Sequence, residues 1–235
     1  MKLFSTTVKY YLLIFNLTVV FHTDINAQDA SAINYLQEVG DYAFIFNGRI
    51  EPVYSSYTYE NLPYYINSDF TEASVVYKNI YYPNQKARLD LFKEQLIILP
   101  TEKRFGIVLN SQNVNKVFIH GRTFIFLNTA KDNGMKKGFY IQLLEENKIQ
   151  LICKENFNIR QKLITYVFDR KVTFFLRYNG RYYTVKNKGS FSKIFPQYKK
   201  QINQYVKDNK LNFRQNTEAS LTSLAVYCEK LLTSI

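Results

Sequence analysis

The chain has no tryptophan, only two cysteines and two histidines, and eight glycines among its 235 residues. Each scarcity argues against a class of site. A Gly-rich loop that binds phosphates needs more glycine than this chain offers, and zinc sites usually need clusters of His and Cys. Without tryptophan, a sugar- or peptide-binding surface would have to depend on tyrosine. We therefore expect no metal and no cofactor.

Groups that could perform catalysis are equally sparse. Beyond residue 27, His120 is the only histidine, so any Ser–His or Cys–His pair would have to use it. It lies beside Gly121 between two predicted strands, as a turn histidine would. Glu145 and Glu146 stand together at a hairpin tip, where solvated charge is more usual than a glycosidase pair. The sequence favours a protein without enzymatic activity, and a hydrolase with an irregular site around His120 is the weaker alternative.

The first 27 residues have the order of a secretory signal peptide. Two lysines precede an uncharged run of 12 residues, Tyr10–Phe21, and a polar stretch then ends at Ala27, where we expect cleavage. The run is short for a membrane span, which needs roughly 20 apolar residues. Residues 28–235 should therefore be exported, to the periplasm or the outer membrane, with the external medium as the remaining alternative.

Positive charge is concentrated in the C-terminal part of the chain. Residues 28–146 hold 12 basic and 13 acidic residues, whereas residues 147–235 hold 17 basic and 5 acidic. Such a field attracts anionic partners, although a solvated face of scattered lysines needs none. Export argues against nucleic acid, which leaves an envelope protein or an anionic surface, including peripheral contact with a membrane. The candidate basic residues are Arg181, Lys186, Lys188, Lys193, Lys199 and Lys200.

Short apolar runs separated by turn signals dominate residues 73–186. We expect roughly eleven short strands spaced about 8 to 12 residues apart, as in an antiparallel sandwich, barrel or meander. Asn179-Gly180 is the clearest hairpin turn, because both residue types tolerate positive φ. Asn47-Gly48 predicts another, after a strand over Tyr42–Asn47. Ala73–Tyr82 is expected to form one strand that ends at Pro83-Asn84.

After Gly189 the apolar spacing becomes helical. Ser190 is expected to cap a short turn that ends at Pro196, and two amphipathic helices follow, over Gln197–Asn209 and Thr217–Leu232. The predicted fold is α+β and mainly β, an antiparallel multi-stranded sheet followed by two C-terminal amphipathic helices. Its parts are a signal peptide (1–27), a β-rich domain (28–189) and a helical segment packed on the sheet (190–235).

Two further groups of residues are candidates for special roles. The segment Glu51–Phe70 has no clean period and is expected to be a long ordered loop or edge segment. Its tyrosines could form a binding surface, and they are Tyr54, Tyr57, Tyr59, Tyr64 and Tyr65. Export would allow a disulfide between Cys153 and Cys228, whereas two buried free thiols are the slightly favoured alternative.

Two stretches carry a resemblance to a known group of proteins. They are Ile119–Phe124 (IHGRTF) and the region from Asn179-Gly180 to Lys210-Leu211-Asn212-Phe213. With them the chain resembles a family of secreted, β-rich proteins of Bacteroidota whose activity is not established. The resemblance implies a β-rich body, a hairpin, a short turn, a basic helix and a final helix. It also implies a periplasmic or cell-surface setting, and it supplies no catalytic residues.

These observations together favour a non-enzymatic interaction or structural protein of the periplasm or outer membrane. It would contact its partner through the sheet surface and the basic C-terminal region. A carrier that holds a small ligand in a barrel-like cavity is the main alternative.

Overall fold

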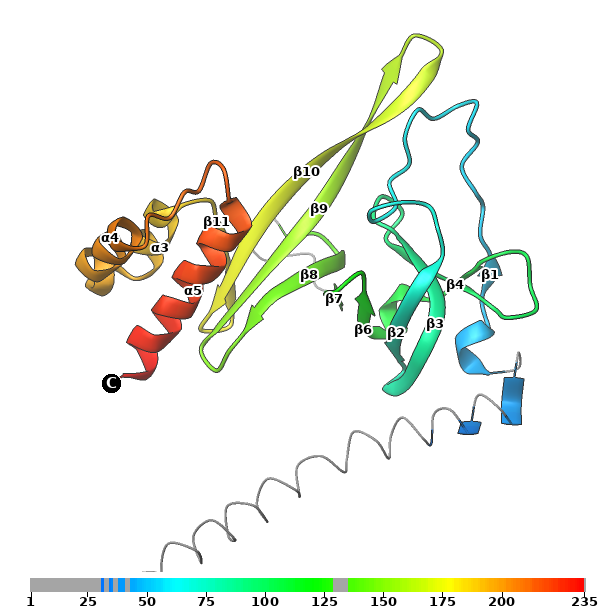
Figure 1. Ribbon diagram of the computed structural model, residues 1–235, viewed down its shortest axis with the longest axis horizontal. Helices are drawn as coiled ribbons and strands as arrows, with labels where there is room; N and C mark the ends of the chain where they lie inside the picture. The colour runs from blue at the N-terminus through cyan, green and yellow to red at the C-terminus, as the bar shows by residue number, and fades with distance from the viewer. Residues whose placement is uncertain (1–30, 32–33, 36–37, 41–42, 129–134, 235) are drawn as a thin grey trace, which may run out of the picture.

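The structure is a computed structural model and describes residues 31, 34–35, 38–40, 43–128 and 135–234. The predicted signal peptide, 1–27, lies outside the described residues. The described chain forms one antiparallel sheet of eleven strands followed by three α-helices (Figure 1). Among the described residues, no helix is long and apolar enough to cross a membrane. The predicted class, mainly β with C-terminal helices, is confirmed.

The strands are connected mostly as a meander, and neighbours along the chain are usually neighbours in the sheet. They are β1 (Arg49–Ile50), β2 (Thr71–Tyr77), β3 (Ile80–Asp90), β4 (Gln95–Leu99), β5 (Ile107–Val108), β6 (Val114–Ile119), β7 (Arg122–Leu127), β8 (Gly138–Glu145), β9 (Ile149–Lys162), β10 (Thr165–Tyr178) and β11 (Arg181–Val185). Their order in the sheet is β1-β5-β4-β3-β2-β6-β7-β8-β9-β10-β11. The two edge strands do not pair, so the sheet is open and the barrel on which the carrier alternative depended does not form.

The open sheet is nevertheless strongly curled around its main core. Lys154 on β9 lies 2.5 Å from Glu94, which follows β3, although four strands separate β3 from β9 in the sheet. The main core gathers side chains that alternate inward along the strands, and Val75, Leu96 and Val117 are among its fully buried members. This alternation is the pattern that predicted most of the strands.

The first third of the sheet departs from the sequence prediction at two places. The predicted strand over Ala73–Tyr82 is a hairpin, because Lys78 and Asn79 both adopt positive φ and connect β2 to β3. Pro83 and Asn84 do not end a strand but lie in a bulge of β3. Proline has no backbone N–H, and at a bulge this does not interrupt the hydrogen bonds between β2 and β3. The predicted strand over Tyr42–Asn47 is also wrong, since Phe44–Phe46 forms a 3-10 helix, η3.

The longest hairpin, β9–β10, extends well beyond its neighbours. Each strand has 14 residues in continuous register, but β8 pairs with β9 only as far as Cys153, and β11 pairs with β10 only from Phe174 onward. Beyond those points the two strands project as a ribbon at the top of Figure 1. The loop between β1 and β2, Glu51–Phe70 as predicted, rises beside this ribbon.

The C-terminal helices cover one face of the sheet at the end formed by β8 to β11. They are α3 (Lys188–Ile194), α4 (Lys199–Asp208) and α5 (Thr217–Thr233). A short 3-10 helix, η5 (Pro196–Tyr198), connects α3 to α4, and another, η4 (Ser111–Asn113), precedes β6. The turn predicted after Ser190 is therefore a helix. Asn187 rather than Ser190 caps it, because the Asn187 side chain accepts the N–H groups of the next turn.

A second core fixes these helices to the sheet. Leu224 of α5 and Phe191 of α3 are completely buried in it, together with Leu176 of β10. The two cysteines lie in different cores, Cys153 in the main one and Cys228 in the helical one, and both are free and buried. The structure therefore contains two buried thiols and not the disulfide left open by the sequence, and burial raises the pKa of each to about 12.

Candidate functional site

The helical end of the molecule contains a groove of about 1040 Å³. It is formed by the end of β11, α3, one side of α4 and the segment that leads to α5. Its lining residues are Lys186, Asn187, Lys188, Gly189, Ser192, Lys193, Lys199, Asn203, Val206, Lys207, Lys210, Leu211, Asn212, Phe213 and Arg214. We call this set the basic groove, because seven of these residues are cationic and none is acidic.

The cations of the basic groove have no partners within the described protein. All seven side chains belong to exposed residues, and none forms an ion pair with a described acidic residue. Asp208 is the one acidic residue between residues 186 and 214, and it accepts a hydrogen bond from Gln204 at 2.7 Å. The groove therefore presents uncompensated positive charge to whatever enters it.

Helix geometry explains why these lysines share one side. Lys199, Asn203 and Lys207 are spaced four residues apart on α4 and so lie on one face of the helix. Lys188 and Lys199 are the first residues of α3 and α4, and neither helix has an acidic residue in its first turn. Because the N-terminal end of a helix dipole disfavours cations, helix stability does not account for these two lysines.

The basic groove also contains apolar side chains. Val206, Leu211 and Phe213 are half-buried and pack on the helical core. The chain reverses direction after α4 through Lys210, whose φ is +49°, and the N–H of Leu211 then bonds to the carbonyl of Val206 at 3.1 Å. This helix end positions the apolar residues beside Lys207 and Lys210, so the groove can contact both an anionic group and a short apolar segment.

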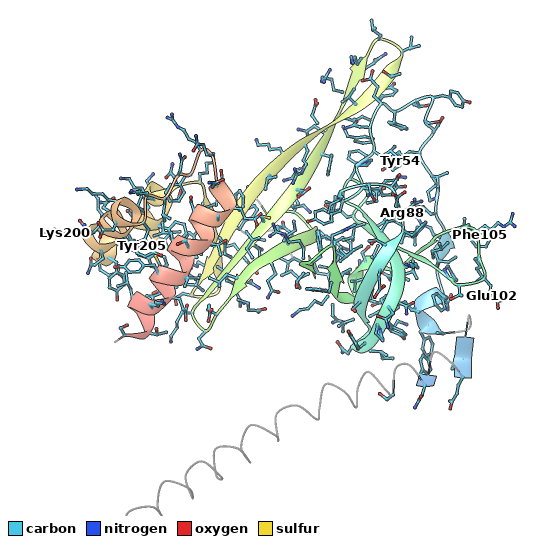
Figure 2. All side chains as sticks on the ribbon, in the orientation of Figure 1. Tyr54, Arg88, Glu102, Phe105, Lys200 and Tyr205 are labelled. Carbon is cyan, nitrogen blue, oxygen red and sulfur yellow. The ribbon has the colours of Figure 1, made fainter. Side chains whose placement is uncertain are left out.

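The basic groove includes part of the set expected from the sequence. Lys186, Lys188, Lys193 and Lys199 line it, whereas Arg181 and Lys200 do not. Arg181 begins β11 at the far end of that strand, and Lys200 is one residue along α4, about 100° around the helix from Lys199. Figure 2 shows Lys200 at the outer edge of the helical end.

Sequence reasoning missed Lys207, Lys210 and Arg214 as members of the basic groove. The four-residue spacing from Lys199 through Asn203 was a signal that could have found Lys207. No family model, curated protein or solved structure matches this chain. What the basic groove does must therefore be argued from its own charge and shape.

The predicted tyrosine surface is not a single surface. Tyr54, Tyr59 and Tyr64 pack with Phe168 of β10 into an aromatic cluster with ring centroids 5.2 to 5.8 Å apart. Tyr65 instead packs on Phe124 and the exposed His120, at 4.8 and 5.9 Å, and Tyr57 is 92% exposed. Tyr54 and Tyr59 thus connect the loop to the ribbon through Phe168, and Tyr64 packs behind Tyr54.

Buried polar contacts hold this aromatic cluster in place. The Tyr54 hydroxyl donates to Asp90 at 2.8 Å, and the Tyr64 hydroxyl donates to Glu51 at 2.7 Å. Arg88 pairs with Glu51 at 2.5 Å and lies over the ring of Tyr64 at 4.6 Å. Burial, and then the neighbouring carboxylates, raise the pKa of Tyr54 and Tyr64 well above the usual range for tyrosine. The charges here are neutralised internally, which is typical of a structural network.

Groups of metal-ligand type do not converge among the described residues. In that part of the chain, three or more His, Cys, Asp or Glu side chains nowhere come together as they would around an ion. His120 has a φ of +49° and occupies the exposed turn between β6 and β7. The basic groove is therefore the strongest candidate site in the described structure.

Proposed function

We propose that the protein is an exported interaction protein of the cell envelope that binds a phosphate-bearing membrane surface through the basic groove. The observation that carries the proposal is the set of seven unpaired cations around one hollow without an acidic lining residue. Export is supported by the sequence pattern of residues 1–27. The resemblance to secreted proteins of Bacteroidota supports the same setting.

A membrane surface agrees with the chemistry of the groove better than an acidic protein does. Lipid head groups supply phosphate oxygens at high density, and each basic residue near an anionic membrane contributes roughly 1 kcal/mol of binding. Val206, Leu211 and Phe213 offer apolar contact beside the cations. A lipid presents a phosphate next to an apolar chain, and this arrangement is matched by a cationic groove with apolar residues.

The proposal is tested by reversing charges inside and outside the basic groove. Lys188→Glu combined with Lys199→Glu places acids at the first residues of α3 and α4, where the helix dipole favours them. Folding should therefore be preserved. Binding to vesicles of equimolar phosphatidylcholine and phosphatidylglycerol should fall by roughly a hundredfold or more, because four units of charge change. Cosedimentation measures the bound fraction.

The matched control changes the same charge outside the groove. Lys200→Glu combined with Lys116→Glu alters two exposed lysines, on α4 and β6, that do not line the hollow. It should weaken binding far less than the groove variant does. Equal loss in both variants would show that only net charge matters, and equal binding of the native protein to phosphatidylcholine vesicles would contradict the proposal. If an acidic protein is the true partner, the vesicles will not bind.

A further inference from the structure

The ribbon formed by the outer halves of β9 and β10 ends in an apolar tip. The two strands are connected by Leu163 and Ile164 alone, and these side chains are 89% and 92% exposed. The tip stands at the end of a projection of about nine residues per strand, or roughly 30 Å (Figure 1). Two large aliphatic side chains are therefore held in solvent away from both cores.

The residues of the tip are unsuited to the turn that they form. Leu163 has a φ of +53°, and Ile164 does not have a positive φ, which is the pattern of a type II′ turn that favours glycine at its first position. The other two-residue turns of this sheet, Lys78-Asn79, His120-Gly121 and Asn179-Gly180, each contain at least one Asn or Gly, which tolerate positive φ, whereas the tip contains neither. Neither folding nor burial explains an aliphatic pair at this place, so an external contact is the remaining explanation.

Hydrogen bonds from the loop between β1 and β2 support the ribbon behind the tip. An isolated two-stranded ribbon is marginally stable in water. Here the Asn61 side chain bonds to both the N–H and the carbonyl of Phe168, at 2.8 and 2.9 Å. Glu60 pairs with Lys162 and accepts from Thr165, at 2.9 and 2.8 Å. The loop thus braces the ribbon up to the residues that flank the tip.

Exposed tyrosines and paired charges surround the apolar tip. The apolar pair comes first, and Tyr166, 37% exposed, lies two residues behind it. Tyr57 precedes Thr58, whose carbonyl accepts the N–H of Tyr166 at 2.8 Å, so a second exposed tyrosine lies at the same level. The charges near the tip are paired. Lys162, which directly precedes Leu163, pairs with Glu60, and Arg160 pairs with Asp169 further back, both at 2.9 Å. Tyrosine prefers the boundary between acyl chains and water.

We infer that Leu163 and Ile164 insert into the outer part of a lipid bilayer and anchor the protein there. The choice of a bilayer as the occupant rests on the proposed function, while the tip itself is independent of the basic groove. Because the charges beside the tip are paired, they oppose a position at the membrane interface less than unpaired charges would. The basic groove supplies the attraction to anionic head groups. The two contacts would act together, one electrostatic and one apolar.

A tryptophan placed at the tip tests the inference directly, because the chain contains none. Ile164→Trp keeps the tip apolar and supplies a single reporter. With phosphatidylcholine–phosphatidylglycerol vesicles, its emission should shift to the blue and be quenched by brominated acyl chains. Phe118→Trp, at a 53% exposed position on β6, is the control and should show neither change. An unshifted, unquenched tip tryptophan on bound protein would overturn the inference.

A second variant removes the apolar tip without harming the turn. Leu163→Gly combined with Ile164→Ser gives the residues that a type II′ turn favours. Its thermal stability should be equal to or higher than that of the native protein. Its vesicle binding at high salt, which screens the basic groove, should be at least about tenfold weaker, since each buried aliphatic side chain contributes on that scale. Unchanged binding would refute anchoring by the tip.

The two proposals can fail separately. If the basic groove has no role, Lys188→Glu/Lys199→Glu binds normally while the tip tryptophan still shifts. If the tip has no role, the groove variant loses binding while Leu163→Gly/Ile164→Ser behaves like the native protein at every salt concentration.

Discussion

At the scale of single residues, a buried ion pair next to the main core contributes to the stability of the sheet. Lys154 is 4% exposed and pairs with Glu94 at 2.5 Å, while Glu94 also accepts the N–H of Phe139 at 2.6 Å. Burial is the largest influence on both groups, raising the pKa of Glu94 and lowering the pKa of Lys154. Gly138 leaves the space for this pair, because a Cβ there would meet the Glu94 carboxylate at 2.3 Å.

Breaking this pair should be costly. Glu94→Gln leaves the Lys154 ammonium buried without a carboxylate, and the free energy of unfolding should fall by about 3 kcal/mol. Urea denaturation measures the loss. Glu60→Gln, which breaks the exposed pair with Lys162, is the control and should cause no comparable change. Similar stabilities for the two variants would show that the buried pair has no special role.

Asp90 should make stability depend on pH. Burial is the largest effect on this carboxyl and raises its pKa, although the N–H groups of Phe92 and Lys93 and the Tyr54 hydroxyl bond to it. The folded state then binds a proton more readily than the unfolded state. The contribution of Asp90 to the free energy of unfolding should fall as pH rises from about 3.9 through the raised value.

Asp90→Asn removes this titration. Urea denaturation at a series of pH values should show a decline through that window in the native protein that is smaller in the variant. Identical pH profiles for the two proteins would mean that the carboxyl titrates alike in the folded and unfolded states.

At the scale of elements, the sequence predicted most strands but few of their limits. The sequence predicts strands over Gln95–Leu99 and Val114–Ile119, and β4 and β6 have these bounds, because each is a short run that ends at a turn signal, Pro100 or His120-Gly121. The outer halves of β9 and β10 were not predicted, because both faces of the projecting ribbon are open to solvent and its sequence therefore needs no alternation of apolar and polar residues. The basic groove was half predicted, because Lys186 to Lys199 are close in sequence, whereas Arg214 joins them only through the turn after α4.

The helices should unfold together with the sheet. Leu224 is 0% exposed in the core that α5 shares with β9 and β10, so Leu224→Ala should cost about 3 kcal/mol. Leu163→Ala, at an 89% exposed leucine, is the matched control and should leave stability within about 0.5 kcal/mol. Circular dichroism at helical and strand wavelengths should give one shared transition. Two separate transitions would mean that the helical segment folds independently.

At the scale of the whole molecule, the basic groove and the apolar tip are two separate surfaces for which we propose the same partner, a membrane. The basic groove lies at the helical end, and the apolar tip lies at the end of the ribbon (Figure 1). Between them lie the curled sheet, the two cores and the braced loop. Such a molecule can engage a surface at two points, so that the first contact raises the effective concentration of the second.

Amide hydrogen exchange with and without anionic vesicles tests this account most directly, since it locates the contact on the chain. Peptides covering residues 186–214 and the tip at residues 160–166 should gain protection when phosphatidylglycerol is present and not with phosphatidylcholine alone. The strands β2 to β4 should exchange as before. Protection confined to those strands, or no change at any peptide of bound protein, would contradict the account.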